Sequence, residues 1–388
     1  MEFKVNVGVL NTILKTLKVT YSNKPTLEIL TNISIEAKED KLIFQSSNGT
    51  TSQRFVLQST DIKETGAICT PYDKVAKLVA ALNPNVDVTF KLKTTNNKTQ
   101  LIMQCNRSRY KLNTLEFENF PKLPQLDEKD NSSEKITLST NFIQSSFKSI
   151  EPSLSDDKTD VLSNAYLYND EDTLNLIATN RHMFTNVELP SQQLKSDFII
   201  PGNLIKGLAK TKLNSKKTAN VTIWNNANQV ALNWQNALLE VTMFSVKPNK
   251  QYLSTDIIKR VLDQVKNNMY TLKINRVGML NILERVNIAN DKKENTGVLS
   301  INENQFILTD MQYTGEEILS NETSAFDKSF TVGFNIDYCI DILKSYTDEY
   351  VNLMFAQNED LYLRPVLIVG SDTRKKSILT PCRIKVEA

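Results

Sequence analysis

The chain has 388 residues, of which 40% are hydrophobic and 23% charged, values typical of a folded globular protein with two or three domains. No run of about 20 apolar residues occurs, and residues 1–5 alternate in polarity, so neither a membrane-spanning helix nor a secretory signal is expected. The net charge of +2 excludes a protein that binds nucleic acid over its whole surface. Either nucleic acid is not the partner, or the positive charge is confined to one face.

A strand followed by a helix is predicted at three places along the chain. Residues 3–6, 136–139 and 272–275 alternate like strands, and each run leads into apolar residues at helical spacing. Asn6, Ser139 and Asn275 occupy the N-cap position of each predicted helix. These caps are about 135 residues apart, an interval typical of a repeated domain. We therefore predict three copies of one domain, at 1–128, 134–266 and 268–388, with linkers at 127–133 and near 266–268.

Each copy contains a second change from strand to helix. Thr70 and Asp73 predict a capping box, with Pro71 at the first helical position, and the corresponding helices of the other copies begin after Pro201 and Asn335. Most of the remaining chain has the alternation of short strands, as in residues 41–44, 86–90, 221–224 and 351–355. The fold class is therefore predicted as α+β, with antiparallel sheets and two helices on one face of each domain.

No catalytic constellation is found in the sequence. His182 is the single histidine, which excludes multi-histidine metal sites, and the four cysteines are far apart, as in a protein of a reducing interior. The acidic clusters at 156–157 and 291–294 lie in polar segments typical of solvated loops. We expect no enzyme activity, no cofactor, no metal site and a cytoplasmic location. A metal-dependent nuclease acting through Asp156 and Asp157, and a scaffold that binds only proteins, are the alternatives.

Five segments, at 24–30, 107–123, 177–184, 333–343 and 380–384, resemble in order the bacterial DNA polymerase III beta subunit family, the beta sliding clamps. Ala178-Thr179-Asn180-Arg181-His182 is similar to the family's Ala-Thr-Asp-x-His, and Thr380-Pro381-Cys382-Arg383-Ile384 resembles its terminal Met-Pro-Met-Arg-Leu. The sequence departs from the family at Arg181 (glycine), at Met183 (arginine) and around Lys250, and it continues for four residues past the usual terminus. These departures leave peptide specificity open, and also whether the clamp is cellular or belongs to a phage or plasmid.

The resemblance implies three clamp domains per subunit and a head-to-tail homodimer that forms a closed ring. Helices would line the hole and sheets would form the outer wall. The implied partners are double-stranded DNA, a replicative DNA polymerase and a clamp loader, and no membrane partner is expected.

Three groups of candidate residues follow. The basic residues expected to face DNA lie on the predicted helices, with Lys24 added by the resemblance, and are Lys15, Lys24, Lys74, Lys77, Lys148, Lys206, Lys210, Arg276 and Lys344. The resemblance implies a partner-peptide pocket formed by Leu162, Thr179, His182, Phe184, Asn335, Tyr338, Pro381, Cys382, Arg383 and Ile384. It also implies a dimer interface in which Tyr110 and Leu112 of one subunit meet Ile288 of the other.

Overall fold

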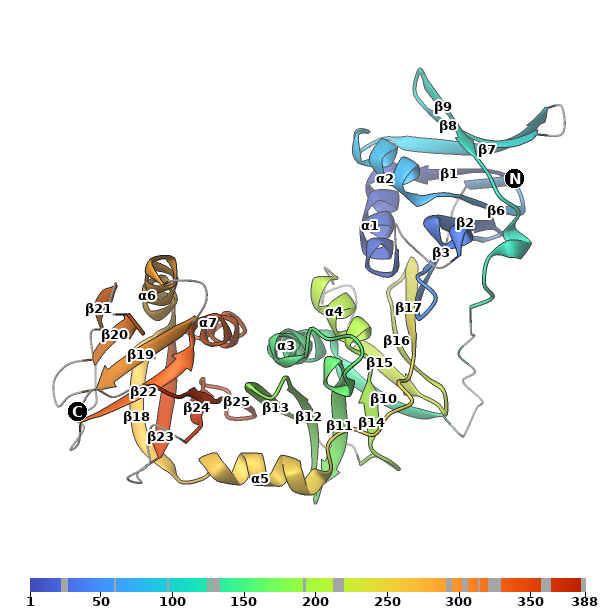
Figure 1. Cartoon of the computed structure of the whole chain (residues 1–388). Coiled ribbons are helices and arrows are strands. Elements are labelled where there is room, and N and C mark those ends of the chain that lie inside the picture. Colours follow the sequence, from blue (N-terminus) through green and yellow to red (C-terminus); the bar gives the residue numbers. More distant parts are fainter. Residues whose placement is uncertain are drawn as a thin grey trace. The chain divides into compact units, whose positions relative to one another are not determined.

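The computed structural model describes residues 1–21, 27–58, 61–95, 98–123, 126, 133–190, 193–211, 220–290, 295–301, 306–312, 315–319, 329–356 and 364–384. The chain forms two compact units, each described here by itself (Figure 1). Unit 1 comprises Met1–Gln144 and Asn203–Lys247, and unit 2 comprises Ser145–Gly202 and Pro248–Ala388.

The described strands of unit 1 form two antiparallel sheets. Sheet A has the order β5-β1-β7-β8-β9, with β1 Glu2–Asn6, β5 Asp61–Glu64, β7 Asp87–Thr95, β8 Lys98–Cys105 and β9 Ser108–Asn113. Sheet B has the order β10-β15-β16-β17-β4-β3-β2-β6, with β2 Asn32–Ala37, β3 Lys41–Ser47, β4 Thr51–Gln58, β6 Gly66–Pro71, β10 Glu134–Ser139, β15 Asn220–Asn225, β16 Gln229–Gln235 and β17 Leu239–Val246.

Two helices of unit 1, α1 (Val7–Leu17) and α2 (Tyr72–Ala80), pack side by side next to these sheets (Figure 1). Helix α1 buries its apolar face through Leu10, Ile13 and Leu14, and each such side chain stabilises the fold by about 1.5–3 kcal/mol. The Tyr72 hydroxyl joins the two helices by donating to the Leu14 carbonyl at 2.9 Å. The remaining helical segments of this unit are η1 Lys18–Thr20, η2 Glu28–Thr31, η3 Phe117–Asn119 and most of α4 Gly202–Lys210.

The described strands of unit 2 also form two antiparallel sheets. Sheet C has the order β14-β11-β12-β13-β25-β24-β23-β18, with β11 Ala165–Asp170, β12 Thr173–Thr179, β13 Met183–Leu189, β14 Phe198–Ile200, β18 Asn268–Asn275, β23 Tyr350–Ala356, β24 Val366–Val369 and β25 Lys375–Leu379. Sheet D has the order β21-β20-β19-β22-β26, with β19 Thr296–Ile301, β20 Phe306–Asp310, β21 Glu316–Leu319, β22 Phe330–Asn335 and β26 Pro381–Cys382.

Helices α6 (Arg276–Ala289) and α7 (Ile336–Lys344) pack against each other and bury Leu283 and Leu343 in one core with sheets C and D. Helix α5 (Thr255–Val265) runs along sheet C (Figure 1), and its buried residues Ile258 and Val265 share a second core with Phe184. The other helical segments of unit 2 are most of α3 Thr140–Ile150, η4 Glu151–Ser153 and η5 Val161–Ser163.

The predicted fold class is confirmed, and the same strand pairings recur along the chain. Strands β1 and β7, β10 and β15, and β18 and β23 are antiparallel pairs, and each first strand leads directly into a helix. Asn6, Asn275 and Asn335 cap the helices that follow them, because their Oδ1 atoms accept backbone N–H groups at 3.2, 2.8 and 3.0 Å. The three-domain boundaries stay a prediction, and residues 127–132 of the first predicted linker lie outside the described residues.

Two details differ from the sequence predictions. The prediction of a capping box at the start of α2 was wrong. Helix α2 begins at Tyr72 with Pro71 as its N-cap. The Thr70 hydroxyl donates to the Asn113 carbonyl, and the Asp73 carboxylate accepts from the Tyr21 hydroxyl. Helix α5 was not predicted, although its buried residues Ile258 and Val265 are seven apart, which is two helical turns. The expected linker near 266–268 is the short turn between α5 and β18.

Candidate functional site

The loop before β13 is the rigid centre of the predicted peptide pocket in unit 2. The Asn180 side chain accepts the backbone N–H groups of His182 and Met183 at 3.0 and 2.7 Å. The Thr179 hydroxyl accepts from the Arg181 amide at 3.1 Å and donates to the Met183 carbonyl at 2.7 Å. These four hydrogen bonds hold the loop in one conformation, and the exposed His182 ring projects from it.

The last described residues of the chain form one side of this site. The backbone of Thr380 donates to the His182 carbonyl at 2.9 Å, and β26 then pairs with β22 at the start of α7. A Cβ on Gly333 would lie 2.4 Å from the Ile384 side chain, so the absence of a side chain at Gly333 lets the terminal segment pack closely. The His182 ring stacks on Tyr338 of α7, with ring centroids 5.5 Å apart.

The structure therefore brings together most of the predicted pocket residues, but at different depths. His182 and Arg383 are exposed, and half-buried positions are occupied by Asn335, Tyr338, Pro381, Cys382 and Ile384. Leu162, Thr179 and Phe184 are 2%, 6% and 4% exposed, and Phe184 belongs to the core beneath α5. These three side chains support the site from below.

Arg181, where the family has glycine, keeps a backbone conformation that suits glycine. Its φ is +75°, and left-handed backbone costs a residue with a Cβ about 1–2 kcal/mol. The side chain is 67% exposed, and its guanidinium lies 2.7 Å from the carboxylate of Asp160. Asp160 also accepts the Leu162 amide at 3.1 Å, so the ion pair ties the loop to η5. The Lys250 ammonium donates to the Thr159 carbonyl beside it.

Part of the surroundings of the terminal segment could not be predicted from the sequence. A hollow of about 270 Å³ is lined by residues 380–383 together with Gln264, Arg364 and Pro365. Gln264 belongs to α5, a helix that was not predicted. Arg364 directly precedes β24, and no sequence pattern around it distinguishes it from an ordinary surface arginine. Only the tertiary arrangement makes these residues neighbours.

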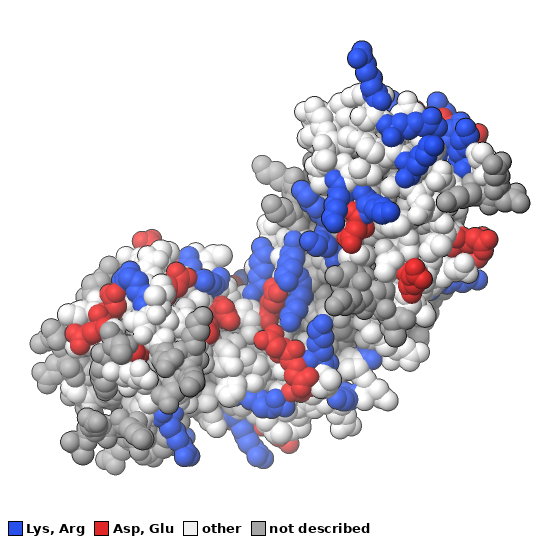
Figure 2. Space-filling view, turned by 45° about the horizontal axis from the view of Figure 1, so that its top comes forward, with Lys and Arg blue, Asp and Glu red and all other residues white. Residues whose placement is uncertain are grey.

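The predicted DNA-facing residues differ in what their side chains contact. Figure 2 shows Lys and Arg side chains gathered on the face of unit 1 in the upper part of the view. In this unit Lys15, Lys74, Lys77 and Lys210 are exposed and Lys206 is half-buried. In unit 2 Lys148 is exposed, whereas Lys344 pairs with Glu284 at 3.0 Å and Arg276 donates to the Asp348 carbonyl at 2.7 Å. Lys24 lies outside the described residues.

The predicted dimer contacts lie on one outer strand, β9, and near the end of helix α6. Strand β9 is an edge of sheet A and exposes Arg109 and Lys111, while its Tyr110 is half-buried and Leu112 is only 3% exposed. The Leu112 side chain thus belongs to the core of unit 1, and a charge there would disturb folding as well as assembly. Ile288, near the end of α6, is 85% exposed.

The edge of sheet D next to α6 is β21, which carries the opposite charge from β9. Glu316 is exposed and Ile318 is 61% exposed. Glu317 forms a bidentate ion pair with Arg285 of α6, with nitrogen–oxygen distances of 2.6 and 2.9 Å. The end of α6 and β21 therefore form one surface with apolar and acidic side chains.

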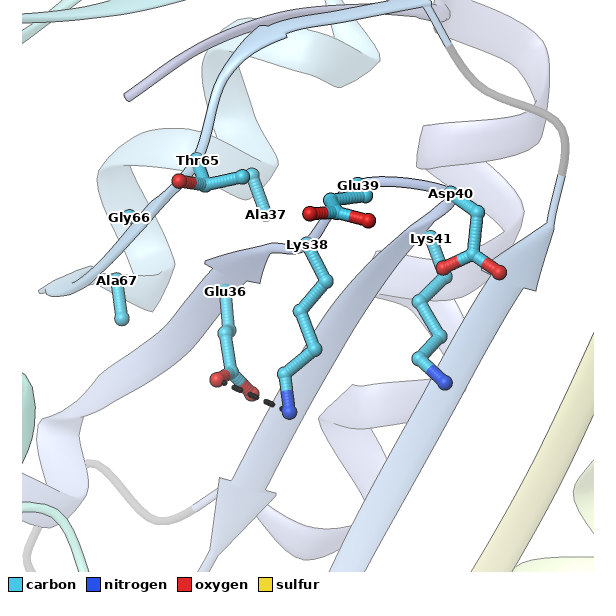
Figure 3. A pocket seen from close by; sticks show the side chains of 9 residues that line it. All are labelled: Glu36, Ala37, Lys38, Glu39, Asp40, Lys41, Thr65, Gly66 and Ala67. Atoms are coloured by element: carbon cyan, nitrogen blue, oxygen red, sulfur yellow. Dashed lines mark ion pairs between the residues drawn. The ribbon is translucent and has the colours of Figure 1, made fainter.

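A larger hollow, of about 530 Å³, lies in unit 1 at the turn between β2 and β3 (Figure 3). It is lined by residues 36–41 and 65–67, and Lys38 pairs with Glu36 at 3.3 Å. Glu39, Asp40 and Lys41 give its rim both signs of charge. None of the predicted site residues lies in this hollow.

The carboxylates of the nuclease alternative lie in a short polar loop. Asp157 accepts from the backbone and the hydroxyl of Thr159 at 2.9 and 2.8 Å, and these hydrogen bonds lower the pKa of its carboxyl group. Among the described residues no group of three or more His, Cys, Asp or Glu side chains is placed to hold a metal ion. No helix in the described part of the chain is long and apolar enough to cross a membrane.

Comparison with known proteins assigns this architecture to a family. Residues 1–124 match the family model of the DNA polymerase III beta subunit, N-terminal domain, and residues 259–376 match that of the C-terminal domain. The chain belongs to the DNA polymerase III beta subunit family.

The likeness extends over the whole length of related proteins. The beta sliding clamp of Chlamydia muridarum is 22% identical, with 99% of each chain covered, and that of Staphylococcus aureus is 25% identical, with 98% of each covered. Among solved structures, the beta sliding clamp of C. crescentus has a TM-score of 0.83 at 19% identity, covering 99% of each chain. The DNA polymerase sliding clamp of Bacillus subtilis has a TM-score of 0.82 at 19% identity, with the same coverage.

Proposed function

We propose that this protein is a DNA sliding clamp: a ring subunit that encircles duplex DNA and tethers a replicative polymerase to it. The observation that carries the proposal is the match to beta sliding clamps over the full length of both chains, at both the sequence and the fold level. The protein then acts as an accessory subunit and performs no covalent chemistry. It works where the replicating DNA lies, in the cytoplasm.

Complementary edge strands support the closure of a ring by two subunits. Strand β9 offers backbone hydrogen-bonding groups flanked by Arg109 and Lys111, and β21 offers the same groups flanked by Glu316. If β9 of one subunit pairs with β21 of the other, both edges are covered, which also protects them from aggregation. Since the two surfaces differ, the contact is head-to-tail, and a second copy of it closes the ring.

A ring retains DNA by its topology, so its contacts with DNA can remain weak. Tight base contacts would stall sliding, because each bidentate contact contributes about 1–3 kcal/mol of base discrimination. Exchangeable attraction of phosphates to Lys15, Lys74 and Lys77 on α1 and α2 is sufficient, and such attraction weakens steeply with salt. Positive charge concentrated on helices accounts for DNA binding by a chain whose net charge is only +2.

The site around His182 then captures partner proteins. Exposed and half-buried aromatic and apolar groups beside a rigid loop are what a short peptide with apolar side chains needs for docking. The polymerase and the clamp loader would use this site in turn. In this proposal each subunit of the ring consists of the three repeated domains predicted from the sequence.

Retention on DNA of different topology tests the proposal. The protein is loaded onto nicked circular DNA with a clamp loader and ATP, half of the sample is linearised, and both halves are separated by gel filtration in high salt. Retention on circles together with loss from linear DNA supports a closed ring that slides off ends. Equal retention on both would mean ordinary contact binding and would contradict the proposal.

A further inference from the structure

The hollow beside the terminal segment has an unbalanced positive charge. None of the residues that line it is acidic, while Arg364 and Arg383 are both exposed and, within the described residues, neither has an ion-pair partner. Two other arginines of unit 2 are neutralised: Arg285 pairs with Glu317 at 2.6 Å, and Arg374 pairs with Asp372 at 2.8 Å. Two guanidinium groups at one hollow therefore attract an anion.

This hollow adjoins the predicted peptide pocket. Thr380 lines the hollow and donates its backbone N–H to the His182 carbonyl. Pro381 also lines the hollow and pairs with Phe334 of β22, next to Asn335, which caps α7. Residues 380–383 are thus a wall shared by the hollow and the pocket, so a peptide seated at His182 has the hollow within reach.

We propose that Arg364 and Arg383 bind a carboxylate of the partner peptide and make this clamp selective for acidic peptides. The proposal rests on the proposed function, since it needs the peptide pocket. A guanidinium can donate two parallel hydrogen bonds to one carboxylate, which supplies both attraction and orientation. The hollow of about 270 Å³ is large enough for a carboxylate with its nearest methylene groups, and the Gln264 amide can donate to the same oxygen atoms. The occupant is either an Asp or Glu side chain or the terminal carboxylate of the peptide.

The test measures binding of three fluorescein-labelled peptides to the full-length protein by anisotropy. All three share one apolar core of leucine and phenylalanine. One has flanking glutamates and an amidated terminus, one has glutamines and an amidated terminus, and one has glutamines and a free terminal carboxylate. The protein variants are R364Q with R383Q, and R260Q as a control that removes an exposed arginine of α5 outside the hollow.

We expect the wild-type protein and R260Q to bind at least one of the carboxylate-bearing peptides about tenfold more tightly than the neutral one. The double variant should bind all three peptides alike. Preference for the glutamate peptide alone identifies a side-chain carboxylate, and preference for the free terminus identifies the terminal one. Equal binding of all peptides by wild type, preference retained in the double variant, or no peptide binding would each overturn the inference. Retention on circular DNA, measured on the same preparations, shows separately whether the clamp function stands.

Discussion

Replacing Ile288 by aspartate should open the proposed ring without unfolding the subunit. The side chain is 85% exposed in the single chain, so the fold gains almost nothing from its burial, and the substitution should leave the free energy of unfolding nearly unchanged. In the dimer the same side chain would be buried, and losing an isoleucine of this size from an apolar contact costs about 2 kcal/mol. A closed ring contains the contact twice, so the loss is about 4 kcal/mol, which weakens dimerisation roughly a thousandfold.

Sedimentation equilibrium at micromolar concentration measures this directly. The wild-type protein should have twice the chain mass of 44.1 kDa, and I288D should approach the mass of a single chain. I257D is the matched control, because Ile257 is an isoleucine of α5 that is 44% exposed and distant in sequence from both edge strands. A dimer of undiminished stability in I288D would refute the proposed interface, and dissociation of I257D would show that the effect is not specific to it.

Three further results are expected. Changing Lys15 and Lys74 together to glutamine should reduce the magnitude of the slope of log DNA affinity against log salt concentration by up to about 2. K344Q is the control: it removes a lysine already paired with a carboxylate of α6 and should leave the slope unchanged. In urea unfolding R181G should be about 1 kcal/mol more stable than R181A, since both lose the ion pair but only glycine relieves the strain at φ +75°; equal stability would contradict this. Burial lowers the pKa of Lys375 from its ordinary 10.5 to about 7, so the unfolded chain holds the proton that the folded chain releases. The free energy of unfolding should therefore rise between pH 7 and 10.5 by up to about 1.4 kcal/mol per pH unit, a rise that K375M should lack.

Much of the candidate site could be predicted from the sequence because local rules govern its parts. Asn335 precedes an apolar helical pattern, and the structure confirms it as a cap. The Thr-Asn-Arg-His segment follows a strand of apolar residues and forms the loop that presents His182. In both places the hydrogen bonds join residues at most four positions apart, so the pattern in the chain already contains the contact.

The burial of individual side chains and the pairing of charged groups could not be predicted from the sequence, because both depend on residues that are distant in the chain. Phe184 was expected to line a pocket, but it faces the core that α5 covers, and α5 itself was missed. Lys344 resembles the other helical lysines in sequence, yet Glu284, sixty positions earlier in the chain, neutralises it. Whether a lysine or a phenylalanine is available to a partner is decided by neighbours that the sequence pattern does not specify.

The α+β class, the recurring strand-to-helix units and the family resemblance could all be inferred from the order of residues, because periodicity, helix caps and short motifs are local properties of the chain. The folded arrangement was needed to show that β9 and β21 are edge strands with opposite charge, and that Arg364 and Arg383 line one hollow. Those features arise where segments far apart in the chain meet. Their energies come from packing and from Coulomb interactions across space, which the order of residues along the chain does not reveal.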